Sequence, residues 1–169
     1  GERRRARREA RANPGALVVV GLTENNDAWV LDEVYNKSEL VEEYWAPRAR
    51  ELMQKWRFNE WCADPAEPDN LRRFSNAGIR VTGHRNYGSG AFDEHARSVL
   101  SGIRTMAGII SAGKLHVDKT RCPNALNEIK SYRWDETPRG DWLERPAPHQ
   151  KDHAVTALRY AVSYAMKPG

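Results

Sequence analysis

Short apolar runs separated by turn-forming residues dominate the first part of the chain. Residues 16–23 form an apolar, β-branched run, which is typical of a buried strand. A second run at 27–35 follows after only a short polar turn, so the pair predicts an antiparallel hairpin. Three further short runs predict strands, the last of them at an edge of the sheet: 59–63, 79–82 and 115–117.

Apolar residues spaced three or four positions apart predict helices between these runs. The clearest helix covers residues 92–111 and ends before Gly113. Residues 38–56 show a similar stripe, but Pro47 should kink that helix or mark its true start. Residues 133–148 are rich in arginine, proline and charge and are expected to form a loop. The other helices are expected at 68–77, 124–132 and 149–166.

A hairpin followed by strands that alternate with helices predicts an α/β fold with one mixed sheet covered by helices on both faces. A chain of 169 residues is long enough for one well-buried domain and too short for two ordinary ones. We therefore expect a single domain over residues 13–169. The sequence has no apolar stretch that approaches the ~18 residues of a membrane span and no secretory signal at its start.

The net charge of +4 lies in the first twelve residues, which carry six arginines and two glutamates. The remaining residues hold 21 basic and 21 acidic side chains, so the body of the protein is neutral. Residues 1–12 are therefore predicted to be a basic arm, either solvated or in contact with phosphate. The two cysteines, Cys62 and Cys122, cannot form a disulfide framework and are interpreted as ordinary reduced thiols.

Asp64 is the first candidate for chemistry. It directly follows the apolar residues 61–63, and Pro65 turns the chain away behind it. A carboxylate at the end of a buried strand lies at the rim of the sheet, where open α/β folds build their sites. An Asp-Pro pair is also common in turns that have no function, so this residue alone does not decide between the two interpretations.

Asp152 is the second candidate, at the start of the last predicted helix. Thr156 lies one turn further along the same face. An acid at a helix N-terminus is also favoured by the helix dipole without any catalytic role. His149 and His153 have the spacing of a zinc pair, but the sequence offers no third ligand, which argues against a zinc site.

Several enzyme classes are excluded because their motifs are absent. The sequence contains no phosphate-binding loop of the GxxxxGK[ST] type, so this chain is not the ATPase of a motor. It also lacks GxSxG, HExxH and catalytic Cys/His patterns.

Taken in order, six segments of the sequence resemble the C-terminal nuclease domain of phage large terminase subunits. The strongest likenesses are Ala-Asp-Pro-Ala-Glu-Pro at 63–68, which resembles the strand-end acidic motif, and Asp-His-Ala-Val-Thr-Ala-Leu-Arg-Tyr-Ala at 152–161, which resembles the closing helix. The others are 13–22, 29–35, 101–103 and 127–134. Each motif is weak to moderate alone, but their order and spacing together are specific, and they cover residues 13 to 166.

The resemblance implies an RNase H-like fold with two divalent ions, Mg²⁺ or Mn²⁺, bound by acidic residues. By matching positions, Asp64 is the metal-binding and catalytic acid of the strand end, and Asp152 is that of the final helix. It also implies cleavage of concatemeric double-stranded viral DNA during packaging, in the cytoplasm of the bacterial host. The portal and the small terminase subunit are the implied partners of the full-length motor.

The sequence departs from the family at two positions. Relatives carry a third aspartate at the end of a first strand, shortly before the Asn-Pro-Gly segment, whereas residues 7–12 here contain no aspartate and no apolar run. Glu9 is the nearest acid, and the first strand is therefore expected to be missing or altered. Thr156 stands where relatives often place a further aspartate.

These departures leave three functions open. The first is an active endonuclease, the second is a catalytically incomplete module that docks DNA or the portal, and the third is a resolvase-like nuclease of the same superfold. Candidate DNA contacts are Arg85 with the 84–91 loop, Lys151, and the arginines of 133–145.

Overall fold

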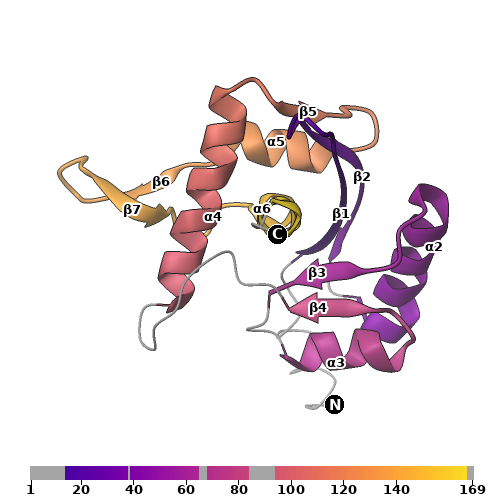
Figure 1. Ribbon diagram of the computed structural model, residues 1–169. Coiled ribbons are helices and arrows are strands. Elements are labelled where there is room, and N and C mark those ends of the chain that lie inside the picture. Colours follow the sequence, from indigo (N-terminus) through magenta and orange to yellow (C-terminus); the bar gives the residue numbers. More distant parts are fainter. Residues whose placement is uncertain (1–13, 38, 65–67, 84–93, 167–169) are drawn as a thin grey trace, which may run out of the picture.

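The computed structural model describes residues 14–37, 39–64, 68–83 and 94–166, which form a mixed α/β fold (Figure 1). Its strands are β1 (Pro14–Leu22), β2 (Ala28–Lys37), β3 (Trp61–Ala63), β4 (Val81–Gly83), β5 (Leu115–Val117), β6 (Trp134–Glu136) and β7 (Trp142–Pro146). Its helices are the π-helix η1 (Val41–Trp45), α2 (Ala46–Trp56), α3 (Pro68–Asn76), α4 (Glu94–Ser111), α5 (Pro123–Ser131) and α6 (His153–Ala165).

The predicted hairpin of β1 and β2 is confirmed. The two strands pair antiparallel from Pro14↔Lys37 to Leu22↔Ala28, with an irregularity in register between Val19 and Val20. Their turn closes because the Thr23 hydroxyl accepts a hydrogen bond from the Asp27 N–H at 3.0 Å. β5 pairs parallel with the other side of β2, so it is an edge strand, as predicted.

The predicted mixed sheet covered by helices is present as β1-β2-β5, but the other described strands are not joined to it. They contain a three-stranded sheet in the order β1-β2-β5, a separate parallel pair β3-β4, and a separate hairpin β6-β7. Among the described strands, none pairs with both β1 and β3, so β3-β4 stays separate from the β1-β2-β5 sheet. The expected basic arm at 1–12 and the expected missing first strand fall outside the described residues.

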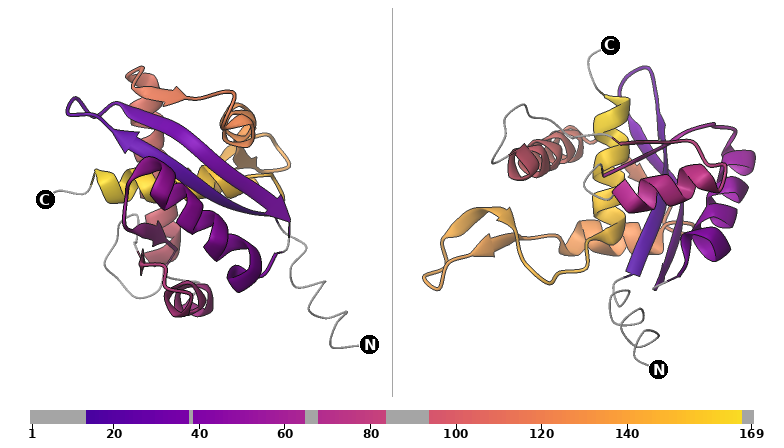
Figure 2. Two further views of the ribbon diagram at one scale, coloured as in Figure 1. Left: turned by 90° about the vertical axis from the view of Figure 1, so that its right-hand side faces the viewer. Right: turned by 90° about the horizontal axis from the view of Figure 1, so that it is seen from below.

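Helices cover both faces of the β1-β2-β5 sheet (Figures 1 and 2). Successive side chains of β1 point to opposite faces. Val18 packs in the core cluster that includes Leu158 of α6 and Met106 of α4. Leu17, its neighbour, packs against the second cluster, which contains Trp45 at the end of η1 and Ala49 of α2. The two-sided burial of β1 explains its continuous apolar sequence.

Pro47 marks the true start of α2, one of the two outcomes expected from the sequence. It occupies the first turn of the helix, where its missing N–H costs nothing, and the preceding turn is the π-helix η1. α2 ends at Arg57, whose φ of 55° is left-handed and whose N–H reaches the carbonyl of Met53.

The loop expected at 133–148 is wrong, because β6 and β7 form a hairpin there that projects from the body (Figure 1). The Thr137 N–H donates to the Asp141 carbonyl at 2.9 Å, and Gly140 takes a φ of 88° in the turn. The arginine and proline content hid this hairpin, since few of its residues are buried. In the described part of the chain, no helix is both long and apolar enough to cross a membrane.

Candidate functional site

Asp152 is the N-cap of α6, whereas the sequence predicted a helix that already begins at residue 149, and its side chain does not act as the cap. Its φ of −139° and ψ of 19° lie outside the helical region, and its backbone carbonyl accepts the first helical hydrogen bond from Thr156 at 2.8 Å. The side chain makes no capping hydrogen bond. The alternative interpretation of Asp152, an acid favoured by the helix dipole, needs no capping hydrogen bond and stays a prediction.

Glu128 of α5 performs the capping instead. Its Oε1 accepts hydrogen bonds from the backbone N–H groups of Ala154 at 2.8 Å and Val155 at 3.2 Å. Glu128 is only 4 % exposed, and a carboxylate is favoured where the helix dipole is positive. This contact fixes the start of α6 and leaves the Asp152 side chain available for another role.

Gln150 holds the segment that leads into Asp152. Its side-chain amide donates to the carbonyls of Arg133 and Ala147, each at 3.0 Å, and accepts from the Arg133 N–H at 3.0 Å. His149, beside it, has a φ of 60°. The hydrogen bonds of Gln150 and the left-handed backbone of His149 explain why α6 begins at His153. The apolar pattern had predicted a start at residue 149.

Asp64 directly follows β3 and lies against α6. Tyr160 of α6, only 4 % exposed, is its partner. Burial raises the pKa of Tyr160 to about 12, and the negative charge of Asp64 and a hydrogen bond with it act in the same direction. A tyrosine hydroxyl that donates to a carboxylate holds its proton more tightly, so the contact with Asp64 adds to the larger effect of burial.

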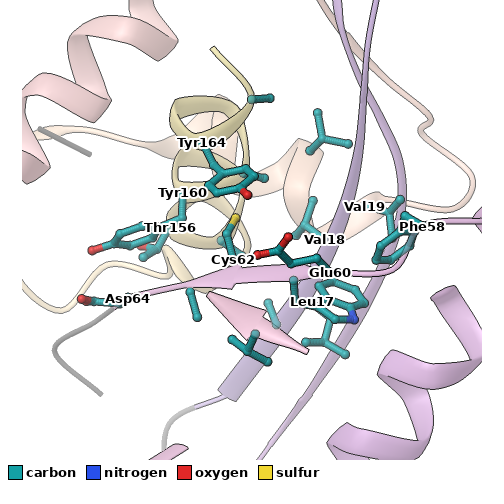
Figure 3. Close-up of a pocket in the computed structure, with 18 of the residues that line it drawn as sticks. Leu17, Val18, Val19, Phe58, Glu60, Cys62, Asp64, Thr156, Tyr160 and Tyr164 are labelled. Atoms are coloured by element: carbon teal, nitrogen blue, oxygen red, sulfur yellow. The ribbon is translucent and has the colours of Figure 1, made fainter. Parts of the chain in front are cut away.

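Asp64 lies at one border of a cavity of about 540 Å³ between β1, β3 and α6. Figure 3 shows Asp64 near Thr156 and Tyr160, with Glu60 and Cys62 of the same strand region directed inward. The lining is mostly apolar, and burial raises the pKa of the Cys62 thiol to about 11. Burial therefore keeps the Cys62 thiol protonated at neutral pH, as in an ordinary thiol.

Asp64 and Asp152 both lie next to α6. Asp64 follows β3, and Asp152 directly precedes the helix. Asp152 directly precedes α6, and Tyr160 lies eight residues later, about 12 Å along the axis and about 80° around it. Helical side chains lean back toward the N-terminus, which brings the Tyr160 hydroxyl and its partner Asp64 nearer to Asp152. Thr156 lies between them, one turn after Asp152.

A zinc site at His149 and His153 gains no support. Among the described residues, no group of three or more His, Cys, Asp and Glu side chains is arranged to hold a metal ion. His153 instead packs edge-on against Tyr35, with ring centroids 6.4 Å apart.

Some of the candidate DNA contacts lie in the described part of the chain and others do not. Arg85 and the 84–91 loop fall outside the described residues. Lys151 and the three arginines of the 133–145 segment are exposed. Arg145 forms an ion pair with Asp135 at 2.7 Å, which neutralises part of the positive charge on the hairpin.

Sequence reasoning found both acids but assigned no role to the residues that position them. Tyr160 could have been found from its spacing, since it continues the Asp152 and Thr156 face. Glu128 lies in the 127–134 segment, but its contact with α6 spans 26 residues, and no local pattern encodes it.

The sequence and the fold are both similar to those of known proteins. A family model described as the terminase RNaseH-like domain matches residues 9–165. No curated protein matches the sequence at a significant level.

Solved phage structures share the fold. The large terminase nuclease domain of bacteriophage SPP1, solved with bound Mn, has a TM-score of 0.73 at 22% identity, over 92% of this chain and 81% of that one. The nuclease of the thermophilic phage G20c with bound cobalt has a TM-score of 0.55 at 16% identity, over 92% and 83%.

The HK97 large terminase has a TM-score of 0.64 at 10% identity, over 93% of this chain but only 38% of that one. The structural likeness to these proteins shows a shared fold, and the family match covers nearly the whole sequence. The chain belongs to the terminase RNaseH-like domain family.

Proposed function

We propose that this domain is a metal-dependent endonuclease of a viral DNA-packaging terminase. It cleaves concatemeric double-stranded DNA by two-metal hydrolysis of the phosphodiester bond, and Asp64 and Asp152 are its catalytic, metal-binding acids. The observation that carries the proposal is the attachment of Asp64, through Tyr160, to the helix that Asp152 begins. Family membership supports the same conclusion.

The donor atoms fit the metals that the proposal requires. Mg²⁺ and Mn²⁺ prefer hard oxygen ligands, which the two aspartates supply. The Asp152 side chain is not used to cap α6, so binding a cation would cost no helix contact. Bound ions of this kind activate a water molecule and stabilise the leaving oxygen.

The surrounding residues position the two acids. Glu128 fixes the first turn of α6, and Gln150 fixes the chain just before it, so the Asp152 backbone is held from both sides. Tyr160 donates a hydrogen bond to Asp64, which limits the rotation of that carboxylate. Thr156 adds a neutral hydroxyl near Asp64 (Figure 3).

A second candidate function is a catalytically incomplete module that docks DNA or the portal. It is favoured by one observation: the described residues hold no cluster of three potential ligands. In this function Asp64 and Asp152 keep their positions, but the domain does not hydrolyse DNA.

Plasmid cleavage with Mn²⁺ separates the two functions. We expect the domain to cut supercoiled plasmid, and Asp64→Asn and Asp152→Asn each to lower the rate at least ~10-fold, since each removes a charged ligand. Asp69→Asn is the matched control, because Asp69 is an exposed acid of α3 outside the site, and it should cut at the normal rate.

No cleavage by the unsubstituted domain would favour the docking module. A strong preference for four-way junctions over linear duplex would favour a resolvase-like nuclease of the same superfold.

A further inference from the structure

Arg159 of α6 is buried, which is unusual for an arginine. The residue is only 5 % exposed, and it is the one buried lysine or arginine in the described part of the chain. Among the described residues, its Nε has no hydrogen-bond partner. A buried positive charge is costly unless an opposite charge lies close to it. We therefore looked for the acids that compensate this charge next to α6.

Helix geometry places Arg159 on the same side of α6 as Asp152. The two residues are seven positions apart, just under two turns, so they differ by about 20° around the axis and by about 10.5 Å along it. Long side chains in helices lean toward the N-terminus, so the guanidinium of Arg159 extends toward Asp152.

Two tyrosines link this guanidinium to both acids of the candidate site. Its central carbon lies 5.6 Å from the centroid of the Tyr160 ring, and Tyr160 is the partner of Asp64. Burial raises the pKa of the Tyr132 hydroxyl, the positive charge of Arg159 opposes this rise, and the negative charge of Asp152 adds to it. Tyr132 is therefore within electrostatic reach of both Arg159 and Asp152.

Two carboxylates that serve one metal centre repel each other when no metal is bound, and the repulsion grows away from bulk water. An arginine keeps its proton at any ordinary pH and is more weakly hydrated than a lysine, which suits it to a buried counter-charge. Glu128 is another buried acid near the start of α6. Its Oε1 already accepts two backbone hydrogen bonds, from Ala154 and Val155.

We propose that Arg159 is the internal counter-charge of Asp64 and Asp152, a positioning residue that holds the two carboxylates near each other while no metal is bound. The inference rests on the proposed function, because it takes these two acids as the metal ligands. Arg159 does not contact DNA in this role, since so little of it reaches the surface.

A counter-charge has opposite effects on folding and on metal binding. Without metal, it stabilises the folded protein by compensating the acids. Once the carboxylates bind a divalent ion, their charge is neutralised, and the positive charge of Arg159 opposes that binding. A side chain that only fills space would support both, so its removal would weaken both.

Double-mutant cycles without metal, measured by urea denaturation in the presence of a chelator, test the first effect. The neutral variants Arg159→Met and Arg159→Gln should each raise the equilibrium constant of unfolding at least ~10-fold, whereas Arg159→Lys, which keeps the charge, should raise it less. In the Asp64→Asn and Asp152→Asn backgrounds, the effect of either neutral variant should be at least ~3-fold smaller, because less negative charge is left to compensate. The exposed Asp69→Asn should leave the effect unchanged.

Neutral variants that do not fold alone still give a result. Their combination with Asp64→Asn and Asp152→Asn should then restore folding, because the charges are removed together. A combined variant that stays unfolded would contradict the proposal.

Isothermal titration with Mn²⁺ tests the second effect. Arg159→Met and Arg159→Gln should bind Mn²⁺ at least ~3-fold more tightly than the unsubstituted domain, and Arg159→Lys should bind it equally well. Arg80→Met, at an exposed arginine that precedes β4, is the matched control and should not change the affinity.

Three results would overturn the proposal. They are strictly additive effects of Arg159 with both Asp64 and Asp152, coupling found only with Glu128→Gln, and weaker Mn²⁺ binding by a folded neutral variant. Failure of the proposed function would give a different result. Asp64→Asn and Asp152→Asn would then bind Mn²⁺ as tightly as the unsubstituted domain, while their coupling to Arg159 without metal would remain.

Discussion

The buried carboxylate of Glu128 accepts a hydrogen bond of 2.8 Å from the backbone N–H of Ala154. This contact joins α5 to the start of α6, two residues after Asp152. The acid that caps the backbone of α6 is therefore a different residue from the acid that directly precedes the helix, and the Asp152 side chain makes no capping hydrogen bond.

Replacing Glu128 should destabilise the protein. Glu128→Gln keeps an acceptor oxygen but loses the negative charge that the dipole of α6 favours, so we expect a loss of about 1–2 kcal/mol in the free energy of unfolding. Urea denaturation measures this loss. Glu24→Gln, in the exposed hairpin turn, should change stability by less than about 0.5 kcal/mol. Equal effects of the two substitutions would argue against the capping role.

The contact between Tyr160 and Asp64 predicts a change that can be measured without any enzymatic activity. The negative charge of Asp64 helps to raise the pKa of Tyr160 to about 12. Asp64→Asn removes that charge, so the pKa of Tyr160 should fall, although burial keeps it above the ordinary tyrosine value. NMR titration of the labelled Tyr160 ring follows the change. An unchanged pKa in the variant would show that the two groups do not interact.

Asp32 of β2 should contribute stability that depends on pH. Burial alone would raise the pKa of this carboxyl, but hydrogen bonds from Lys55 at 2.8 Å, from the Trp56 indole at 3.0 Å and from the Glu33 N–H lower it below its usual value. A carboxyl whose pKa is lower in the folded state stabilises the protein above its unfolded pKa, and this contribution is lost as pH falls through the folded pKa.

Asp32→Asn should therefore cost about 1–3 kcal/mol at pH 7, and the cost should shrink as the pH falls below the unfolded value of 3.8. Denaturation of both proteins across this pH range gives the comparison, with the exposed Asp141→Asn as control. A cost that stays constant with pH would contradict the assignment.

Replacing Gly15 and Gly108 by alanine should change the free energy of unfolding in opposite directions. A Cβ at Gly15 would lie 2.6 Å from Cζ2 of the buried Trp45 ring, so Gly15→Ala should cost about 1–3 kcal/mol. A Cβ at Gly108, inside α4, meets nothing within 4 Å, so Gly108→Ala should stabilise the protein by about 0.5–1 kcal/mol. Thermal denaturation distinguishes the two effects, and equal shifts would contradict this reading of the packing.

Periodicity predicted the elements that carry strong local signals. The β1-β2 hairpin, α4 and the edge strand β5 all follow from apolar runs and turn residues in the sequence. The β6-β7 hairpin was missed, because Trp142 is 64 % exposed and its neighbours bury little, so no alternating pattern marks it. The division of the sheet was also missed, since strand order depends on long-range pairing.

The candidate site was predictable only in part. Asp64 was predicted as a site residue because a strand ends there, and Asp152 because a helix begins there. Their supports come from tertiary contacts: Glu128 reaches α6 from another helix, and Tyr160 meets Asp64 across a gap of nearly a hundred residues. The Glu128 contact leaves no local trace in sequence spacing, whereas Tyr160 itself continues the spacing of Asp152 and Thr156.

Mn²⁺ binding to the purified domain tests the central claim, that Asp64 and Asp152 serve one metal centre. Isothermal titration would compare the domain with Asp64→Asn, Asp152→Asn, the double variant and the Asp69→Asn control. We predict that each single substitution weakens binding at least ~10-fold and that the double variant loses much less than the sum of the two effects, because the acids act as a unit. Unchanged affinity in either single variant, or strictly additive losses, would contradict the claim.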